Sequence, residues 1–459
     1  MSDFDLFVVG AGSGGVRAAR MAAAAGARVA VAEERYMGGT CVNVGCIPKK
    51  LYSYAAHYRY DFDDSAGFGW RLEPPQFCWD RLRDGKQREI ARLNDIYKNL
   101  LTSSGATILP GRARLCDANT VEMDGKRITS KYILLATGGW PFVPEFPGRE
   151  HVVTSNEIFD LPQFPQRILI VGAGYIAVEF AGIFAGLGAT TMLAYRSGEV
   201  LKDFDADLRQ RFTREAVKHI ELMPNTLVAS VEKGEGGLLV TLENGRRLEV
   251  DCVLFATGRK PNVANLGLEN TRVALNPDGT VAVDANMQTA EPSIYALGDV
   301  VGRLALTPVA LAEGMMVADR LFGDGRRTVS YENVATTIFS HPNIATVGLG
   351  EAEATERFAD LTIFESDFRA LRHTMSGRDE RTYMKVIVDT ASDRVVGMHM
   401  MGPDAGEVIQ GFAAAMNCGL TKAQLDGTLG IHPTLAEEFV TMRTPARQRS
   451  CGREPVSAK

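Results

Sequence analysis

Two cysteines near the N-terminus, Cys41 and Cys46, have the spacing that most directly suggests chemistry in this chain. They lie within the run Gly38-Gly39-Thr40-Cys41-Val42-Asn43-Val44-Gly45-Cys46-Ile47-Pro48-Lys49-Lys50. Two thiols this close together can form and break a disulfide, which requires a thiolate and a good leaving group. The ordinary alternative is a pair of unrelated buried cysteines, but a nucleotide-binding motif stands directly upstream. The pair therefore predicts a disulfide that exchanges electrons with a nucleotide cofactor.

The upstream motif is a glycine loop that joins an expected strand to an expected helix. The loop contains Gly10, Gly12, Ser13, Gly14 and Gly15. The apolar run from Phe4 to Val9 predicts a short buried strand, and the alanine-rich segment from Val16 to Ala25 predicts a helix. Such a loop lets the backbone approach a pyrophosphate, which the N-terminus of the helix then binds.

The next expected strand runs from Arg28 to Ala32 and ends at Glu33. Glu33 follows Gly12 by about 20 positions, the spacing of a carboxylate that binds an adenosine ribose. Strand, glycine loop, helix and acidic residue together predict a dinucleotide site.

A second glycine loop repeats this arrangement in the middle of the chain. It contains Gly172, Gly174, Tyr175 and Ile176, after the strand-like run from Arg167 to Val171. A helix is expected through Gly186, followed by a strand from Thr190 to Tyr195.

The end of that second strand carries no acidic residue for a ribose hydroxyl. Arg196 stands there instead, with Lys202 a little further along, and an arginine in this region suits the 2′-phosphate of NADP. A solvated arginine is the alternative, and the nearby Glu199 is a point against phosphate. We interpret the second site as one for NADPH.

Three further motifs complete a resemblance to the class I flavin disulfide reductases. They are Ala136-Thr137-Gly138, Ala256-Thr257-Gly258-Arg259 and Tyr295-Ala296-Leu297-Gly298-Asp299. With the two glycine loops and the cysteine pair, the similarity extends from about residue 4 to about residue 445. It is strongest to the members that reduce glutathione disulfide, through Cys41 to Lys50, Gly174 to Glu179 and Ile431 to Thr441.

The resemblance implies an α/β fold with two Rossmann-like nucleotide-binding domains and a C-terminal α+β dimerisation domain. The implied domains are 1–140 for FAD, 141–261 for NADPH, 262–332 as a return to the FAD domain, and 333–459 for dimerisation. The implied FAD contacts are Gly10, Gly12, Ser13, Gly14, Gly15, Glu33, Gly39, Thr40, Thr137, Gly138, Asp299 and Thr307. The implied NADPH contacts are Gly172, Gly174, Tyr175, Ile176, Glu179, Arg196, Lys202, Gly258 and Arg259.

The resemblance also implies catalytic roles. Cys41 would exchange with the substrate disulfide, and Cys46 would contact the flavin. Lys49 would lie near the flavin with Glu179 as its carboxylate partner. His432 would act as the acid and base that Glu437 orients, although a histidine before proline is by itself usually a packing or surface residue. In the family this histidine comes from the partner subunit, which implies a homodimer with composite active sites.

The implied substrate is glutathione disulfide. Its contacts would be Ser13, Arg17, Arg20, Tyr97, Glu438 and Thr441. The arginines suit a disulfide that carries four carboxylates, whereas the cationic trypanothione would favour an acid or an aromatic residue. Met315 departs from the family pattern, because many members have an arginine there for a substrate carboxylate. A modified glutathione, trypanothione, lipoamide and a flavin scaffold without turnover stay as alternatives.

The composition is that of a soluble globular protein of several domains. The chain has 459 residues, 45% hydrophobic and 23% charged, with a net charge of −6. Without a basic tract, nucleic acid and membrane surfaces are not expected as partners. We expect no signal peptide, no membrane-spanning helix, no metal site and a cytoplasmic location. Four of the seven cysteines, Cys78, Cys116, Cys252 and Cys418, are expected to be inert packing residues, and Cys451 lies near the C-terminus.

Overall fold

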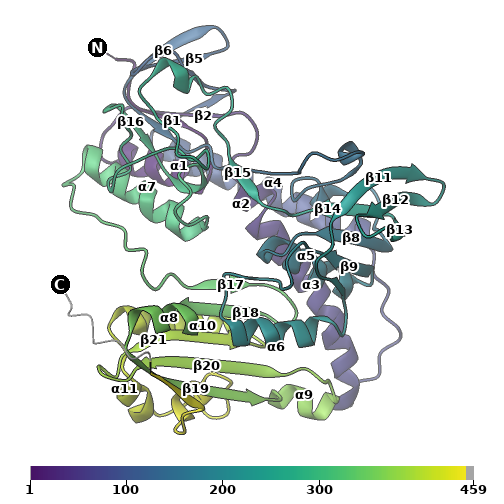
Figure 1. Cartoon of the computed structure of the whole chain (residues 1–459). Coiled ribbons are helices and arrows are strands. Elements are labelled where there is room, and N and C mark those ends of the chain that lie inside the picture. The colour runs from purple at the N-terminus through teal and green to yellow at the C-terminus, as the bar shows by residue number, and fades with distance from the viewer. Residues whose placement is uncertain (1, 451–459) are drawn as a thin grey trace.

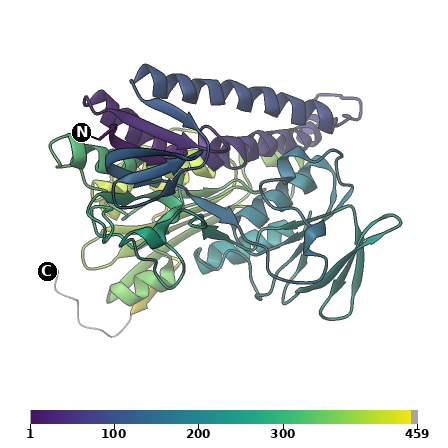
Figure 2. The same cartoon turned by 90° about the horizontal axis from the view of Figure 1, so that it is seen from above.

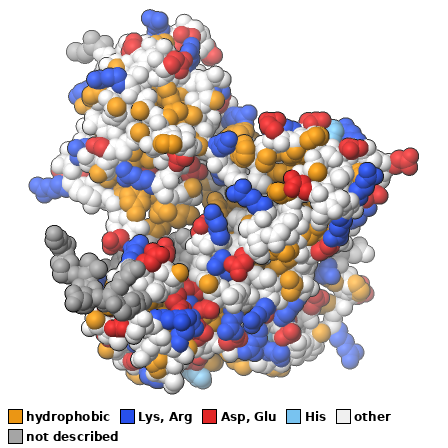
Figure 3. All heavy atoms as spheres, viewed as in Figure 1, with side chains coloured by type: hydrophobic (Ala, Val, Ile, Leu, Met, Phe, Trp, Pro, Cys, Tyr) orange, Lys and Arg blue, Asp and Glu red, His pale blue; other side chains and the backbone are white. Residues whose placement is uncertain are grey.

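A computed structural model describes residues 2–450. Figure 1 shows three lobes, and Figure 2 shows the same arrangement from above. Each lobe is built on its own main sheet. On the face seen in Figure 3, hydrophobic side chains gather on the underside of the lobe that holds the N-terminus, facing the hollow above the lower lobe.

The first lobe contains a sheet with the strand order β3-β2-β1-β6-β5-β4, in which β16 also pairs with β6. The parallel strands are β1 (Phe4–Val9), β2 (Val29–Glu33), β3 (Thr107–Pro110), β6 (Lys126–Leu135) and β16 (Ile294–Ala296). The strands β4 (Arg114–Leu115) and β5 (Thr120–Met123) are antiparallel. The late strand β16 shows that the chain returns to this sheet after building the second lobe.

The helices of the first lobe include the elements that carry the predicted redox site. They are α1 (Ser13–Ala24), α2 (Gly39–Asn43), α3 (Cys46–Ser65), η1 (Ala66–Phe68), α4 (Trp79–Ser103), η4 (Leu268–Asn270), η5 (Gly298–Val300) and α7 (Thr307–Phe322). In Figure 2 the long helices α3 and α4 run along one edge of the molecule.

The second lobe has a parallel sheet with the order β10-β9-β8-β14 and a three-stranded antiparallel sheet with the order β11-β12-β13. Its strands are β8 (Arg167–Val171), β9 (Thr190–Ala194), β10 (Glu221–Met223), β11 (Val228–Gly234), β12 (Gly237–Leu242), β13 (Arg247–Val250) and β14 (Cys252–Phe255). Its helices are η2 (Arg149–His151), η3 (Ile158–Asp160), α5 (Tyr175–Leu187) and α6 (Ala206–Ala216). The strands β7 (Gly139–Pro141) and β15 (Arg259–Pro261) pair where the chain passes between the first two lobes.

The third lobe is a six-stranded antiparallel sheet with the order β17-β18-β21-β20-β19-β22. Its strands are β17 (Thr336–Ile338), β18 (Ile344–Gly348), β19 (Asp360–Phe368), β20 (Thr382–Asp389), β21 (Val395–Met401) and β22 (Arg447–Ser450). Its helices are α8 (Glu351–Arg357), α9 (Leu371–Ser376), α10 (Ala405–Asn417), α11 (Lys422–Gly427) and α12 (Glu437–Thr441). The predicted fold class is confirmed, while the domain boundaries remain predictions.

The two nucleotide-binding sheets repeat one steric device. Gly10 has φ +106°, and a Cβ there would lie 2.5 Å from the carbonyl oxygen of Ala136. Gly172 has φ +142°, and a Cβ there would lie 2.4 Å from the carbonyl oxygen of Ala256. In both sheets the glycine lets the loop pass against the end of a neighbouring strand, as the paired sequence motifs predict.

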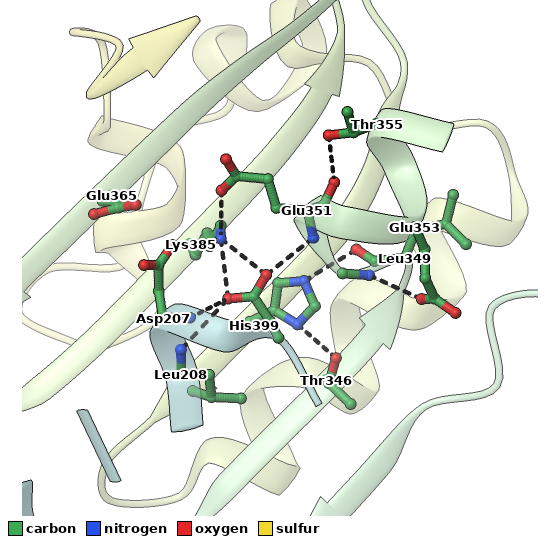
Figure 4. A network of polar contacts seen from close by, with 12 residues as sticks. Asp207, Leu208, Thr346, Leu349, Glu351, Glu353, Thr355, Glu365, Lys385 and His399 are labelled. Carbon is green, nitrogen blue, oxygen red and sulfur yellow. Dashed lines mark hydrogen bonds and ion pairs between the residues drawn. The ribbon is translucent and has the colours of Figure 1, made fainter. Parts of the chain in front are cut away.

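A buried ion network joins the second lobe to the third (Figure 4). Lys385 on β20 is fully buried, and its Nζ lies 2.8 Å from Asp205, 2.7 Å from Asp207 and 2.8 Å from Glu351. Asp205 also accepts hydrogen bonds from the first turn of α6, which it caps. A buried ammonium group is tolerated only where carboxylates compensate it, so this network fixes α6 against the third sheet.

Within residues 2–450, no helix is long and apolar enough to cross a bilayer. The same residues contain no group of three or more His, Cys, Asp or Glu side chains that could hold a metal ion. Cys252 is buried, in keeping with a packing role, and Cys116 is half-buried. The prediction that Cys78 and Cys418 pack inside the protein is wrong, because both are exposed. They occupy the N-cap of α4 and the C-cap of α10, where the chain leaves the core. Cys451 lies outside the described residues.

Candidate active site

Helices α2 and α3 bring the two cysteines together. Cys41 lies inside α2, and Cys46 is the first residue of α3. Between them, Gly45 allows a close backbone contact, because a Cβ there would lie 2.7 Å from the carbonyl oxygen of Thr40. The short connection therefore places both thiols at the N-terminal end of a long helix, where a thiolate is favoured.

The surroundings of the two thiols give them different acidities. A hydrogen bond from Cys41 lowers the pKa of Cys46 to about 6, and Thr307 and Lys49 act in the same direction. The Thr307 Oγ1 lies 3.7 Å from the Cys46 Sγ. The pKa of Cys41 is raised, first by its hydrogen bond to Cys46 and then by burial. In the reduced pair, the thiolate therefore resides on Cys46 at neutral pH.

Lys49 and Glu179 form an ion pair next to the cysteines. Lys49 Nζ lies 2.6 Å from Glu179 Oε1, and Glu179 is buried. The pair connects α3 of the first lobe with α5 of the second. The sequence predicted both residues, and the structure brings them together.

Phe339 is a neighbour of this pair that the sequence analysis missed. Its backbone N–H donates to the same Glu179 oxygen at 2.9 Å, and Lys49 Nζ lies 4.5 Å from the centre of its ring. No motif marks Phe339, which reaches the site only because the third lobe packs on α3 and α5.

The first glycine loop forms a cradle at the meeting point of two helix N-termini. A Cβ on Gly39 would lie 2.6 Å from the Gly12 Cα, so the beginnings of α1 and α2 touch. Gly12, the N-cap of α1, has no side chain that could cap the helix, and the first turn of α1 holds no acidic residue. The backbone N–H groups at the start of α1 are therefore available to an anionic pyrophosphate.

Other predicted FAD residues lie around this cradle. Glu33 ends β2, where its Oε2 accepts from the N–H of Ala11 at 2.7 Å. The buried Thr137 Oγ1 has no hydrogen-bond partner in the described structure, and a bound polar group would satisfy it. Burial raises the pKa of Asp299, whose carboxylate lies 3.8 Å from Arg259. These residues fit a flavin dinucleotide.

A second residue missed by the sequence analysis supports Asp299. The carboxylate of the buried Glu313 accepts from the N–H of Gly298 at 2.7 Å and from the hydroxyl of Tyr331 at 2.8 Å. Gly298 directly precedes Asp299, so Glu313 holds the turn that presents it. An isolated glutamate within a helix gives no sequence signal for this role.

The second glycine loop presents an open surface for the predicted NADPH. Nothing lies within 4 Å of a Cβ built on Gly174, and Tyr175 is 43% exposed. Gly258 has φ +132° with open space beside it. Ile176 is half-buried and packs against the hydrophobic core, so its side chain contributes to packing.

The predicted phosphate-binding cations at the end of β9 remain available. Arg196 and Lys202 are both exposed, and neither forms an ion pair within the described part of the chain. Glu199, which argued against a phosphate, pairs instead with Arg209 at 2.7 Å. The carboxylate therefore does not neutralise Arg196, and the surface fits a 2′-phosphate.

The predicted substrate residues of α1 and α4 lie beside Cys41. Burial raises the pKa of Tyr97, the nearby Cys41 acts in the same direction, and Arg17 and Arg20 oppose it. Tyr97 also packs at the start of α2, because a Cβ on Gly38 would lie 3.4 Å from its Cδ1. Neither arginine has a carboxylate partner among residues 2–450. Ser13 begins α1, on which both arginines lie.

The predicted acid–base pair lies elsewhere in the same chain. His432 Nδ1 is 3.0 Å from Glu437 Oε1, and the histidine side chain is 82% exposed. In Figure 1, α11, which precedes His432, lies at the lower left in the third lobe, whereas α2 lies near the middle of the molecule. Of the other residues predicted here, Glu438 accepts from Ser366 at 2.6 Å, and Thr441 donates to the Glu438 carbonyl at 3.2 Å. One chain therefore does not bring His432 to its own cysteines.

Comparison with known proteins gives matches along nearly the whole chain. Residues 4–314 match the pyridine nucleotide-disulphide oxidoreductase family, and residues 334–443 match the dimerisation domain of that family. A glutathione reductase of Burkholderia cepacia is 48% identical over 96% of this chain and 98% of its own length. A glutathione reductase of a Nostoc species is 44% identical over 96% of this chain and 99% of its own length. A trypanothione reductase of Trypanosoma congolense is 38% identical over 96% of both chains.

Both family models and the full-length relatives therefore agree with the paired sheets, the antiparallel third lobe and the thiol pair: the chain belongs to the pyridine nucleotide-disulphide oxidoreductase family.

Proposed function

We propose that this protein reduces glutathione disulfide to two glutathione molecules, with NADPH as the reductant and FAD as the bound cofactor. The observation that carries the substrate assignment is the position of Tyr97 within electrostatic reach of Cys41, Arg17 and Arg20. Unpaired guanidinium groups around this tyrosine favour a disulfide rich in carboxylates and disfavour a cationic one.

The reaction balances as one NADPH, one proton and one glutathione disulfide giving NADP⁺ and two glutathione thiols. When bound, the flavin supplies the transfer of two electrons from the nicotinamide to the Cys41–Cys46 disulfide. Lys49, held by Glu179, provides a fixed positive charge at the Cys46 end of the thiol pair.

Cys41 performs the exchange with substrate. Because its pKa is raised, Cys41 must first give its proton to a base. Its sulfur then attacks one sulfur of glutathione disulfide, which forms a mixed disulfide and releases the first glutathione thiolate, the group that takes up this proton. Cys46 then attacks the Cys41 sulfur, which restores the protein disulfide and releases the second glutathione thiolate. The Cys41 thiol no longer donates to Cys46 in the mixed disulfide, but Thr307 and Lys49 still act to lower the pKa of Cys46 and favour its thiolate.

A proton donor is needed for the departing thiolates. His432 with Glu437 suits this role, because the carboxylate orients the ring and supports its cation. The exposed position of the histidine supports its contribution to the partner subunit, which brings two incomplete sites together in a homodimer. The dimerisation-domain match supports the same assembly.

We place the enzyme in a reducing compartment such as the cytoplasm, where a protein disulfide is usually catalytic and not structural. Nucleic acid and membranes are not proposed as partners.

The test is steady-state oxidation of NADPH by the FAD-loaded enzyme with glutathione disulfide, trypanothione disulfide and lipoamide. We expect turnover with glutathione disulfide and little with the other two. Faster turnover of trypanothione disulfide or lipoamide would refute the substrate assignment but leave the disulfide-reductase chemistry intact. No NADPH oxidation with any disulfide would instead support the flavin scaffold.

A further inference from the structure

Helices α1 and α7 pack side by side next to the cysteine pair. A Cβ on Gly14 would lie 2.9 Å from the carbonyl oxygen of Ala310, and one on Gly314 would lie 3.3 Å from the N atom of Ala18. These contacts advance in the same direction along both helices, so the helices are parallel. Glycine at both contact positions allows their backbones to approach closely.

This packing determines which residues share a flank of the helix pair. An α-helix turns by about 100° per residue. Arg17 lies three positions after the contact residue Gly14, and Met315 lies one position after the contact residue Gly314. Three positions rotate the side chain by about 300°, which equals about 60° backward, whereas one position rotates it by about 100° forward. Because the contact faces of two parallel helices point toward each other, a backward rotation on one helix and a forward rotation on the other lead to the same side. Met315 therefore lies on the flank that carries Arg17.

A third arginine reaches this flank from the segment after α7. The Arg327 Nη1 lies 3.9 Å from the Met315 Sδ. Its backbone N–H donates to the Asp319 side chain at 2.9 Å, which folds the segment back onto α7. The arginine is thus anchored beside the methionine, although its guanidinium is exposed.

The guanidinium of Arg327 is free to bind an anion. It forms no ion pair within the part of the chain that the structure describes, a property that it shares with Arg17 and Arg20. Its neighbour Arg326 differs, because it lies 3.7 Å from Asp324 and its side chain is 87% exposed. One flank of the α1–α7 pair therefore presents separate positive charges without ion-pair partners among the described residues, and Arg17 of this flank lies within electrostatic reach of Tyr97.

We propose that Arg327 is a specificity-determining residue that binds a carboxylate of the substrate disulfide across Met315. The inference rests on the proposed function, since it concerns the same site and the same anionic substrate. Arg17 and Arg20 hold carboxylates on the α1 side, while Arg327 supplies from a loop the positive charge that the side chain at position 315 lacks.

The test compares Arg327→Gln with the matched control Arg326→Gln in the FAD-loaded enzyme. We expect Arg327→Gln to raise the KM for glutathione disulfide by roughly 3- to 10-fold, the range for a partly exposed charge-assisted contact. The kcat, the KM for NADPH and the melting temperature should stay unchanged, and Arg327→Lys should recover part of the affinity. Arg326→Gln should match the unmodified enzyme.

A second substrate separates carboxylate binding from a general effect. Glutathione disulfide with its glycine carboxylates converted to amides should give the same KM with Arg327→Gln and with the unmodified enzyme. An unchanged KM for ordinary glutathione disulfide in Arg327→Gln would overturn the inference, as would an equal increase for the amide and the acid. Absence of turnover by the unmodified enzyme would instead overturn the proposed function, and this role with it.

Discussion

A single carboxylate oxygen of Glu179 accepts hydrogen bonds both from Lys49 Nζ at 2.6 Å and from the Phe339 N–H at 2.9 Å. These donors come from α3 and from the segment after β17, so one buried oxygen links the three lobes. Lys49 also lowers the pKa of Cys46, while Glu179 raises it. The ion pair therefore acts both on the packing of the lobes and on the acidity of a thiol.

The first prediction concerns the acidity of Cys46. Lys49→Met should raise the pKa of the Cys46 thiol from about 6 toward the ordinary value of 9.0, because it removes the nearby cation. Glu179→Gln should instead lower the pKa of Cys46 below about 6, because it removes a negative charge that disfavours the thiolate. The glutamine keeps an acceptor for the Phe339 N–H. The measurement is a pH titration of thiolate absorbance in the reduced enzyme. Shifts of the same sign in both variants would contradict the assignment.

The second prediction separates the roles of the two cysteines. In the FAD-loaded enzyme, reduction by two electrons should produce a broad long-wavelength absorbance band from the thiolate of Cys46 next to oxidised flavin. Cys46→Ser should abolish this band, whereas Cys41→Ser should show it without reduction. The band should persist down to about pH 6, the lowered pKa of Cys46, and fade below it. A flavin spectrum that neither variant alters would refute the assignment.

The sequence predicted the local elements of this fold well. The strands at Phe4–Val9 and Arg167–Val171 have the expected bounds, since each is a short apolar run that ends at a glycine loop. The first helix begins earlier than expected, at Ser13, because the glycines of the loop themselves form its first turn.

The site was less completely predictable. Phe339 and Glu313 belong to no motif, and their roles arise only from packing between segments far apart in the chain. The predicted packing of Cys78 and Cys418 failed because helix ends expose residues that hydrophobicity alone assigns to the core. The sequence did not reveal Arg327 for the same reason as Phe339, since its position depends on how the segment after α7 folds back onto that helix.

The third prediction concerns the choice of nicotinamide cofactor. Replacing both Arg196 and Lys202 by glutamine should weaken NADPH binding by on the order of 10- to 100-fold, because each charge-assisted phosphate contact contributes about 1.5–3 kcal/mol before solvent screening. The KM for NADH should change little. Arg246→Gln is a suitable control, since Arg246 is a cation of the same lobe that already pairs with Glu221 at 2.9 Å. Equal use of NADPH and NADH by the unmodified enzyme would exclude this selectivity.

The fourth prediction tests whether the active site is shared between subunits. Cys41→Ser and His432→Ala should each be almost inactive. After equal amounts are mixed and exchange subunits at random, half of the dimers are heterodimers with one intact site of two, so about one quarter of the activity should return. Mass spectrometry of the intact dimers verifies the exchange. Verified exchange without recovery would place His432 and Cys41 in one chain's site.

The fifth prediction concerns the stability of the Lys385 network. Lys385→Met should lower the free energy of unfolding by about 3–5 kcal/mol, because the buried Asp205 loses its ion-pair partner, whereas Asp207 and Glu351 keep Arg447. Arg449→Gln is the matched control. It removes a largely exposed cation 2.8 Å from Glu351 and should cost less than about 1 kcal/mol. Urea unfolding at neutral pH provides the comparison, and equal losses in the two variants would contradict a buried network.

The same network predicts how stability depends on pH. Burial opposes ionisation of Asp205 and Glu351, but the surrounding cations and hydrogen bonds outweigh it and lower the pKa of both carboxyls. Carboxyls whose pKa is lower in the folded protein stabilise it above their ordinary values of 3.8 and 4.5, and this stabilisation is lost as the pH falls through the folded values. The unmodified protein should therefore lose stability steeply below about pH 4. In Lys385→Met, whose carboxyls lack the buried ammonium group, the acid-induced loss between pH 5 and pH 3 should be smaller. Parallel pH profiles for the two proteins would show that Lys385 does not hold these carboxyls in their ionised form.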